Sequence, residues 1–344
     1  MRIAIQHTPG SYSDEWITFC KKNQIDFKIV CCYDNNIIEQ LKDCDGLMWH
    51  WNHVDYKANL FARQLIYSLE RMGIKTFPNA QSCWHYDDKV GQKYLLEAIE
   101  APLVKSYVFY SKDKALAWLD QSPLPKVFKL RRGAGSINVK LIKTRQQAKR
   151  FINKAFGKGF KIFNPWNDLK DRLWKLKRDK NWEQILSVLK GMGRSFIPTE
   201  FQKFSTFEKG YIYFQDFVPN NHYDTRLFVI GNRCFGKLRY CRKNDFRASG
   251  SGLFGSESKL LDINAVKIAF ETAKNLNTQS LAFDFVLDDN VPKIIEISYA
   301  SSPITYALCQ GYWDHNLVWY DRDVNPAYFM IEDFVNDINN KVIS

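Results

Sequence analysis

The sequence predicts an α/β fold, with antiparallel hairpins in its second half. Strand-like and helix-like stretches alternate through the first 80 residues, a βαβ pattern. Two turn signals, Gly231-Asn232 and Asp288 to Asn290, each separate two apolar alternating runs. With 344 residues, 45% of them hydrophobic, the chain is long enough for two or three domains with buried cores.

The first 80 residues predict a parallel sheet covered by helices. We expect strands at 2–6, 27–32, 46–51 and 75–77, and helices at 12–23, 36–42 and 57–72. No GxGxxG follows the first strand, so a dinucleotide role has no direct support. The cluster from His50 to His53 follows the third strand, where open α/β sheets place ligands. Two interpretations stay open. The cluster contacts a substrate, or it is a loop whose histidines are exposed and whose tryptophan is packed.

The next segment alternates again. We expect a helix at 83–99 that carries Asp87-Asp88-Lys89 near its start, a strand at 105–110, a helix at 112–120, and strands at 124–129 and 139–142. The loop 131–136 between the last two strands is basic and contains small residues, which suit an anion. It lacks the Walker A spacing, so as a phosphate motif it is weak.

The net charge of +12 is concentrated in one segment. Residues 126–210 contain 22 Lys or Arg and 6 Asp or Glu, and the rest of the chain is net negative. Such a block could bind nucleic acid, an anionic membrane or a polyanionic small substrate. Within it, Leu169, Leu173 and Leu176 recur at helical spacing among basic residues. An ordinary amphipathic helix explains this pattern better than a helix that meets RNA or lipid.

Cysteine usage and the N-terminus predict a cytoplasmic protein. The stretch MRIAIQHTPG has no apolar signal-peptide core, and no apolar run reaches the about 18 residues of a membrane helix. The eight cysteines form no CxxC pair and no zinc-type cluster. We therefore expect buried, reduced thiols.

Two acids stand out in the hairpin from Ser280 to Ser298. Asp284 lies between Phe283 and Phe285, and Glu296 lies between two isoleucines, so each acid points away from its apolar neighbours. If the strands pair about their turn, the two carboxylates can lie close together and need a cation, for which Mg²⁺ is suited. Taken alone, the stretch is better explained as a solvated hairpin with two surface acids.

In their order along the chain, these features resemble the ATP-grasp superfamily, from the βαβ start to Glu296-Ile297-Ser298. The resemblance implies a βαβ domain (1–80), a linking segment (81–125), a basic α+β lid (126–217) and an antiparallel C-terminal domain (218–344). It places nucleotide contacts at Lys89, Lys129, Gln215, Asp216, Phe217, Val218 and Asp224, the last for the ribose. It places metal ligands at Asp284, Glu296 and Ser298, the last in place of the family's usual asparagine.

The resemblance also implies a reaction. ATP and Mg²⁺, as two ions for which Mn²⁺ can substitute, would drive ligation of a carboxylate to an amine through an acyl phosphate. Catalytic contacts would come first from Arg226 and Arg239, then from Arg242 and Arg247. The tract from Asp224 to Gly252 is similar to ATP-grasp proteins of bacterial surface-polysaccharide synthesis, which implies a saccharide carboxylate such as a uronic acid and an amine such as an amino acid. The implied partners include no nucleic acid and no membrane span, and a homodimer is compatible.

Three alternatives stay open at the level of sequence. An ATP-grasp kinase would use the same nucleotide site and phosphorylate an alcohol. A basic nucleic-acid-binding protein would show steeply salt-dependent binding to DNA or RNA. An ATP-grasp scaffold without turnover is the third alternative, and Ser298 is the feature that favours it.

Overall fold

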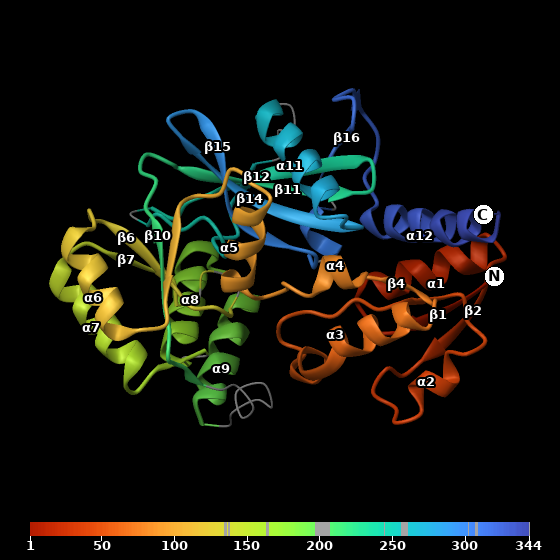
Figure 1. The fold of residues 1–344 in the computed structure, drawn as a ribbon, viewed down its shortest axis with the longest axis horizontal. Coiled ribbons are helices and arrows are strands. Elements are labelled where there is room, and N and C mark those ends of the chain that lie inside the picture. The colour runs from red at the N-terminus through yellow and green to blue at the C-terminus, as the bar shows by residue number, and fades with distance from the viewer. Residues whose placement is uncertain are drawn as a thin grey trace. The chain divides into compact units, whose positions relative to one another are not determined.

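The computed structural model describes residues 1–133, 136, 138–162, 165–196, 207–243, 245–255, 261–301, 303–306 and 309–343 (Figure 1). The chain divides into two compact units. Unit 1 comprises Met1–Asn52, Lys57–Val104 and Val218–Ser344, and unit 2 comprises His53–Tyr56 and Lys105–Phe217. Both ends of the chain therefore belong to the same unit.

The N-terminal sheet of unit 1 is wholly parallel, in the order β2-β1-β3-β4. Its strands are β1 (Arg2–Gln6), β2 (Asp26–Val30), β3 (Gly46–Met48) and β4 (Lys75–Phe77). The helices between them are α1 (Tyr12–Lys22), α2 (Ile37–Gln40) and α3 (Tyr56–Arg71). The predicted alternation is confirmed, and the bounds of β1 and β4 are as predicted.

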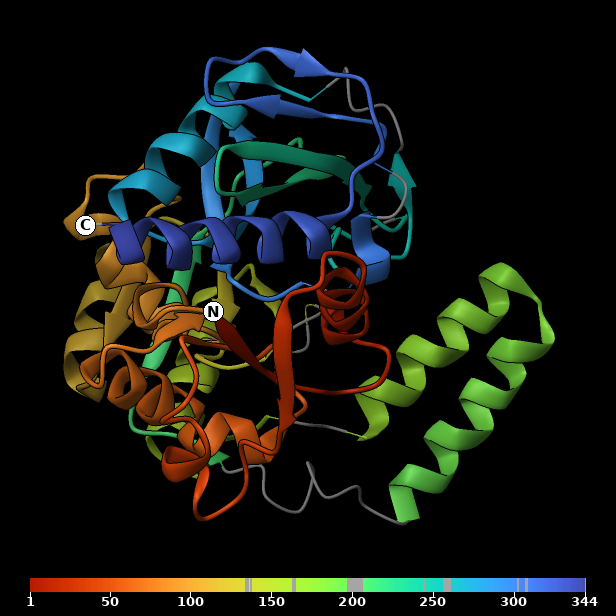
Figure 2. The ribbon, with the colours of Figure 1, turned by 90° about the vertical axis from the view of Figure 1, so that its right-hand side faces the viewer.

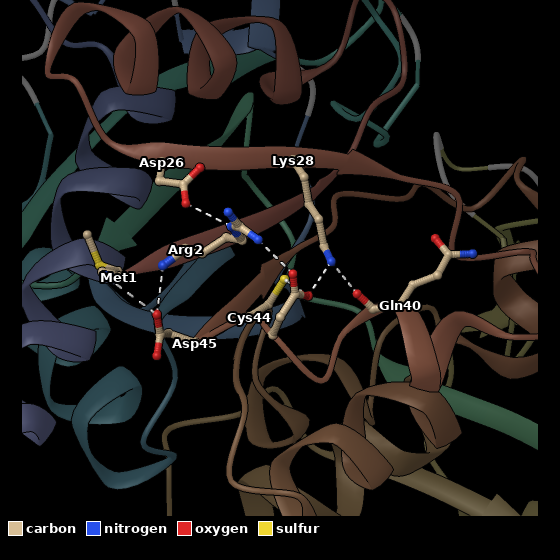
Figure 3. A network of polar contacts seen from close by, with 8 residues as sticks. Met1, Arg2, Asp26, Lys28, Gln40, Cys44 and Asp45 are labelled. Atoms are coloured by element: carbon tan, nitrogen blue, oxygen red, sulfur yellow. Dashed lines mark hydrogen bonds and ion pairs between the residues drawn. The ribbon is translucent and has the colours of Figure 1, made fainter.

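Polar contacts tie the edge of this sheet together at the start of β1 (Figure 3). The Arg2 guanidinium donates to Asp26 and to Asp43, both at 2.7 Å, and its backbone N–H donates to Asp45 at 2.7 Å. Lys28 on β2 also donates to Asp43. The hydrogen bonds from Lys28 and Arg2 hold the pKa of Asp43 at about 2.

The single helix predicted at 83–99 is wrong, because a turn interrupts it. The structure has α4 (Ala80–Cys83) and α5 (Lys89–Ala98) instead. Asp87 has a positive φ of 51°, which a continuous helix cannot contain. Asp88 then caps α5 by accepting from the N–H of Gly91 at 2.9 Å. Asp87 therefore lies in the turn between α4 and α5, and Asp88 starts α5.

The second sheet of unit 1 is antiparallel, in the order β15-β14-β11-β12-β16-β17, with β13 also paired to β12. Its strands are β11 (Tyr223–Ile230), β12 (Arg233–Tyr240), β13 (Phe254–Gly255), β14 (Ser280–Asp288), β15 (Val291–Ser298), β16 (Tyr312–Asp314) and β17 (Trp319–Tyr320). Both predicted hairpins form. Gly231 has a positive φ of 52° in the first turn, and Asp289 and Asn290 have φ values of 48° and 64° in the second.

The helical elements that the structure describes beside this sheet are α11 (Ile263–Asn275), the 3₁₀ turn η2 (Pro303–Tyr306) and α12 (Pro326–Ile343). One face packs on α11, with Leu227, Phe283 and Ala269 in the same core cluster. The other face packs at one end on α12 and the N-terminal sheet, through a cluster that includes Phe228 and Phe334.

Unit 2 has a four-stranded antiparallel sheet in the order β5-β10-β6-β7. Its strands are β5 (Ser106–Phe109), β6 (Lys126–Lys129), β7 (Lys140–Ile142), β10 (Ile212–Asp216) and the separate pair β8 (Phe160–Lys161) and β9 (Phe207–Glu208). Its helices are α6 (Lys112–Gln121), α7 (Arg145–Phe156), α8 (Pro165–Asp179) and α9 (Trp182–Phe196). Figure 2 shows α8 and α9 as an antiparallel two-helix hairpin. Residues 134 and 135 of the predicted basic loop lie outside the described residues.

None of the described helices is long and apolar enough to cross a membrane. All eight cysteines are free thiols, and most are buried as predicted. Cys31 is exposed and Cys241 is half-buried.

Candidate functional site

One face of the antiparallel sheet in unit 1 carries charged residues on four neighbouring strands. Side chains alternate between the two faces of a strand, so residues two apart share a face. The charged face bears Asp224 and Arg226 on β11, Lys237 and Arg239 on β12, Asp284 on β14, and Glu296 on β15. We call Asp224, Arg226, Arg239, Asp284, Glu296 and the neighbouring Lys89 the charged cluster.

Asp284 binds two arginines. Its Oδ1 accepts from Nη1 of Arg226 at 2.7 Å, and its Oδ2 lies 2.8 Å from Nη2 of Arg239. The side chain is only 9% exposed. Burial raises the pKa of this carboxyl, but the charges of Arg226 and Arg239 outweigh burial, and the pKa lies below its ordinary value. Asp284 is therefore ionised at neutral pH and holds both guanidinium groups in place.

Arg239 also binds Asp224 in a bidentate pair, with Nε and Nη2 donating at 2.6 and 2.7 Å. Burial raises the pKa of Asp224, and this effect exceeds the opposing charge of Arg239. Both oxygens of Asp224 are already bonded, so a ribose hydroxyl would have to share them with Arg239. On the other side of Asp284, Nε of Arg226 donates to the hydroxyl of Tyr306 at 3.1 Å.

Glu296 lies directly opposite Asp284 in the pairing of β14 with β15. Its Oε1 is 3.0 Å from Nζ of Lys89, the first residue of α5. Burial lowers the pKa of Lys89, but Glu296, Asp87 and Asp284 together raise it by more, and the ammonium stays charged. Gln92 on α5 accepts from the N–H of Ile297 at 3.3 Å, which fastens the helix to the strand.

The pairing of Asp284 with Glu296 depends on an irregularity in the hairpin. Near the turn, Phe285 pairs with Ile294, whereas the next pair joins Asp284 to Glu296, so Ile295 is an extra residue on β15. Such a bulge shifts one strand by one residue relative to its neighbour. It places Glu296 on the charged face of the sheet.

The acids partly fit a magnesium ion. An ionised Asp284 directly across from Glu296 supplies the hard oxygen ligands that Mg²⁺ prefers, and Glu296 is 30% exposed. Ser298, the third predicted ligand, donates its hydroxyl to the carbonyl of Ala300 at 2.9 Å, which leaves the oxygen lone pairs available. The described residues contain no group of three or more His, Cys, Asp or Glu side chains that could hold a metal. The site therefore suits an ion bound largely by substrate phosphates and water.

Arg242 and Arg247 lie in the loop that follows β12. Arg247 forms an ion pair with Asp245 at 2.6 Å, and Nη2 of Arg242 donates to the carbonyl of Gly250 at 2.8 Å. Burial raises the pKa of Asp245, but the hydrogen bonds and charge of Arg247 lower it by more. These two arginines are thus held by their own loop, whereas Arg226 and Arg239 are held by Asp284.

In unit 2, two of the predicted nucleotide residues, Lys129 and Gln215, lie on one face of the sheet. Lys129 donates to the side-chain oxygen of Gln215 at 2.6 Å. The amide nitrogen of Gln215 donates to Ser106 at 3.0 Å, and Ser106 is also bonded by Tyr213 at 2.9 Å. Lys129 is 7% exposed and Gln215 is 2% exposed, so this polar network is almost fully buried.

Asp216 lies on the opposite face of the same sheet. It binds Lys126 at 2.5 Å, and these two residues are directly opposite in the pairing of β10 with β6. The backbones of Gln215 and Asp216 pair with neighbouring strands, because β10 is an inner strand. Phe217 and Val218 come directly after β10, where unit 2 ends and unit 1 continues.

Several polar residues near these sites were not predicted. Lys237 shares a face with Arg239, and strand alternation would have revealed it. Its Nζ lies 3.6 Å from the centre of the Phe254 ring, and burial lowers its pKa. Lys126 lies on the face opposite Lys129 and meets Asp216 only through the pairing of β6 with β10, and Tyr306 lies in a 3₁₀ turn, so neither has a local sequence signal.

His50 is buried, so the interpretation with exposed histidines is wrong for this residue. Its ring packs edge-on against Tyr12, with centroids 4.8 Å apart. The hydroxyl of Tyr12 lies 2.8 Å from that of Ser301. Burial lowers the pKa of His50 to about 4, so its imidazole is neutral at physiological pH.

The sequence matches no protein-family model and no curated protein. Among solved structures, the D-cycloserine synthetase DcsG superimposes with a TM-score of 0.58 at 10% identity, covering 98% of this chain and 100% of its own. D-alanine–D-alanine ligase from Bacillus anthracis gives 0.56 at 14% identity, with 99% of each chain covered. The ATP-grasp ligase PsnB, complexed with minimal precursor, Mg and ADP, gives 0.54 at 8% identity, with 98% of each chain covered. The likeness spans both units, and the chain has the ATP-grasp fold.

Proposed function

We propose that this chain is an ATP-dependent ligase that joins a carboxylate to an amine. The carboxylate would attack the γ-phosphorus of ATP and give an acyl phosphate and ADP. The amine would then displace phosphate through a tetrahedral intermediate. The observation that carries this proposal is the charged cluster on an ATP-grasp fold, where Asp284 holds two arginines directly across from Glu296.

The proposed cofactors are ATP and Mg²⁺. D-alanine–D-alanine ligase from Bacillus anthracis has been solved with ATP, and PsnB with Mg and ADP. In this chain, Lys89 and Lys129 are the proposed phosphate contacts, and both are buried lysines with fixed partners. We propose that the backbone from Gln215 to Val218, where β10 ends, contacts the adenine ring.

The two central arginines are suited to a transferring phosphoryl group. Asp284 fixes Arg226 and Arg239 before any substrate binds, so their orientation costs little during the reaction. Fixed guanidinium donors stabilise charge on phosphate oxygens in phosphoryl transfer and on the later oxyanion. Asp224 acts through Arg239, and we propose it as a positioning residue in addition to a ribose contact.

Asp284, Glu296 and Ser298 are the proposed metal ligands. A bound Mg²⁺ would neutralise phosphate charge and align the in-line transfer. Without it, Lys89 neutralises Glu296 and the two arginines neutralise Asp284. Two ions, and replacement by Mn²⁺, belong to the same proposal.

The finer substrate proposal is a saccharide carboxylate such as a uronic acid, with an amino acid as the amine. It rests on the tract from Asp224 to Gly252 and on the loop that presents Arg242 and Arg247. Guanidinium groups match the geometry of carboxylate oxygens. Both loop arginines are therefore proposed as contacts to the acid substrate.

The decisive experiment measures ADP and phosphate release with panels of uronic acids and amino acids. A ligase needs Mg²⁺, an acid and an amine together, and releases ADP and phosphate in equal amounts. A kinase would release ADP without free phosphate, would not depend on the amine, and would leave a stable phosphorylated product. Identification of the amide by mass spectrometry completes the assignment.

Two variants link the activity to the site. Glu296→Gln removes the proposed metal ligand, and Lys129→Ala removes the proposed phosphate contact. Normal turnover in both variants would refute the site assignment. Steeply salt-dependent binding to DNA or RNA that is unaffected by Asp284→Asn, with no turnover, would support the nucleic-acid alternative.

A further inference from the structure

The α8–α9 hairpin of unit 2 has an apolar face that its own packing does not cover. Arg172 on α8 donates to the carbonyl and the hydroxyl of Ser187, at 3.1 and 2.8 Å. A Cβ added at Gly191 would lie 2.6 Å from Cδ of Arg172, so the helices approach closely there. Ser187 and Gly191 therefore mark the inner face of α9, towards α8.

The outer face of α9 is apolar and exposed. Trp182, Leu186, Leu189 and Met192 are 71%, 44%, 58% and 48% exposed. At about 100° per residue, their positions fall within one arc that lies opposite Ser187 and Gly191. Large apolar side chains gathered on one exposed face mark a contact surface, because they gain no hydrophobic stabilisation while they are exposed to water.

The arc is nearly symmetric about its midpoint. Along the helix axis, Trp182 and Met192 are the outermost of the four residues, and Leu186 and Leu189 lie between them. Glu183 and Lys190 lie about two turns apart on the same flank of the arc, at similar distances from the midpoint. The two side chains are exposed and have opposite charges.

We propose that α9 is a dimer interface, with the α9 helix of a second copy of this chain as its occupant. In an antiparallel pair related by a two-fold axis, each flank of one helix lies beside the same flank of the partner helix. The two flanks run in opposite directions, so the start of one lies beside the end of the other. Glu183 of one copy then faces Lys190 of the other, twice per dimer. Trp182 packs near Met192 of the other copy, and the leucines meet at the centre.

The charges favour a second copy over a lipid surface. Helices that lie on anionic membranes carry cations along the border of the apolar face. Here Glu183 shares the border with Lys190, and this pair of opposite charges is self-complementary in an antiparallel pair of helices. The cations of α8, including Lys170 and Lys177, lie on the other helix of the hairpin.

The first test is the mass of the full-length chain in solution, measured by sedimentation velocity over a concentration series. We expect a dimer for the wild type and a monomer for Leu189→Asp, which buries a charge at the centre of the interface. Leu60→Asp is the control, because Leu60 is an exposed leucine (72%) on a different helix, α3, and this variant should stay dimeric. A monomeric wild type at the highest concentration overturns the proposal.

The second test reverses the charges. Glu183→Lys and Lys190→Glu each place like charges opposite one another twice, and each should weaken dimerisation about tenfold. The double variant restores both pairs and should dimerise like the wild type. A mixture of the two single variants should form heterodimers in preference to either homodimer.

These outcomes separate the alternatives. If the double variant is as weak as the single variants, Glu183 does not face Lys190 and the antiparallel arrangement is wrong. If the wild type is monomeric and binds phosphatidylserine vesicles in a manner that Leu189→Asp abolishes, the occupant is a lipid surface and the proposal fails.

Discussion

Asp284 stands directly opposite Glu296 across two paired strands, yet the two carboxylates bind different protein cations. Asp284 binds Arg226 and Arg239, and Glu296 binds Lys89. Each acid therefore has a counterion of its own before any ligand arrives. The repulsion between two neighbouring carboxylates, which from sequence alone called for a metal, is already offset by the protein.

Glu296→Gln should abolish most of the ATP-dependent activity. The change removes a proposed metal ligand and leaves the Lys89 ammonium without its carboxylate, so ADP release should fall by at least about a hundredfold. ADP release at saturating Mg²⁺ measures it. Asp288→Asn is the matched control, because Asp288 is an exposed acid on the same hairpin and should keep full activity.

Asp284→Asn should destabilise the fold and also lower the activity. Removal of one partner from a buried ion pair leaves charges without compensation, here Arg226 and Arg239, and costs about 3 kcal/mol of unfolding free energy. Urea denaturation at pH 7 measures the difference. A variant as stable as the wild type would mean that the two arginines find other partners.

The same variant should change the acid dependence of stability. The pKa of Asp284 is lowered in the folded state, so its contribution is present above the unfolded pKa of about 3.9 and is lost as the pH falls below it. The pKa of Asp224 is raised in the folded state, so the contribution of Asp224 to stability changes with pH in the opposite direction. The stability difference between wild type and Asp284→Asn should therefore shrink below about pH 4, as measured by denaturation at each pH.

Lys129→Met should weaken nucleotide binding, whereas Lys126→Met should not. The two lysines lie on opposite faces of one sheet, with Gln215 and Asp216 as their partners. We expect the dissociation constant for ATP to rise about tenfold in the first variant. In the second, only stability should fall, by less than about 1 kcal/mol. Calorimetric titration with ATP distinguishes the outcomes, and equal losses of affinity would contradict the assignment of faces.

Buried histidines should make the fold sensitive to mild acid. Burial lowers the pKa of both His50 and His85 to about 4, below the ordinary value of 6.5. The unfolded chain binds their protons first as the pH falls, so stability is full above about pH 6.5 and is lost between there and pH 4. His50→Phe should flatten this decline in denaturation experiments. An unchanged slope would mean that His50 is accessible to protons in the folded state.

Much of the fold was predictable because its signals are local. Strand alternation, turn residues and the acids of the hairpin are all readable within a few residues. The break between α4 and α5 was missed because Asp87 and Asp88 read as a helix start, while the positive φ of Asp87 has no sequence signal.

The partners of the site residues were not predictable in the same way. Asp284 meets Arg226 through the pairing of β14 with β11, and Lys89 meets Glu296 through the docking of a distant helix. Contacts between residues this far apart depend on the packed structure. Sequence could supply the residue types in the right order, but not which charge neutralises which.

The extra residue in β15 makes the site sensitive to changes in length. The pairing near the turn, extended without interruption, would join Asp284 to Ile295 and turn Glu296 towards the apolar core on α11. Deletion of Ile295 would make the pairing regular and still leave Asp284 opposite Glu296, whereas one residue inserted between Glu296 and the turn, taken up in regular pairing, would turn Glu296 to the other face. Homologues should accordingly tolerate many substitutions at position 295, and those that lack this residue should keep the two acids opposite one another.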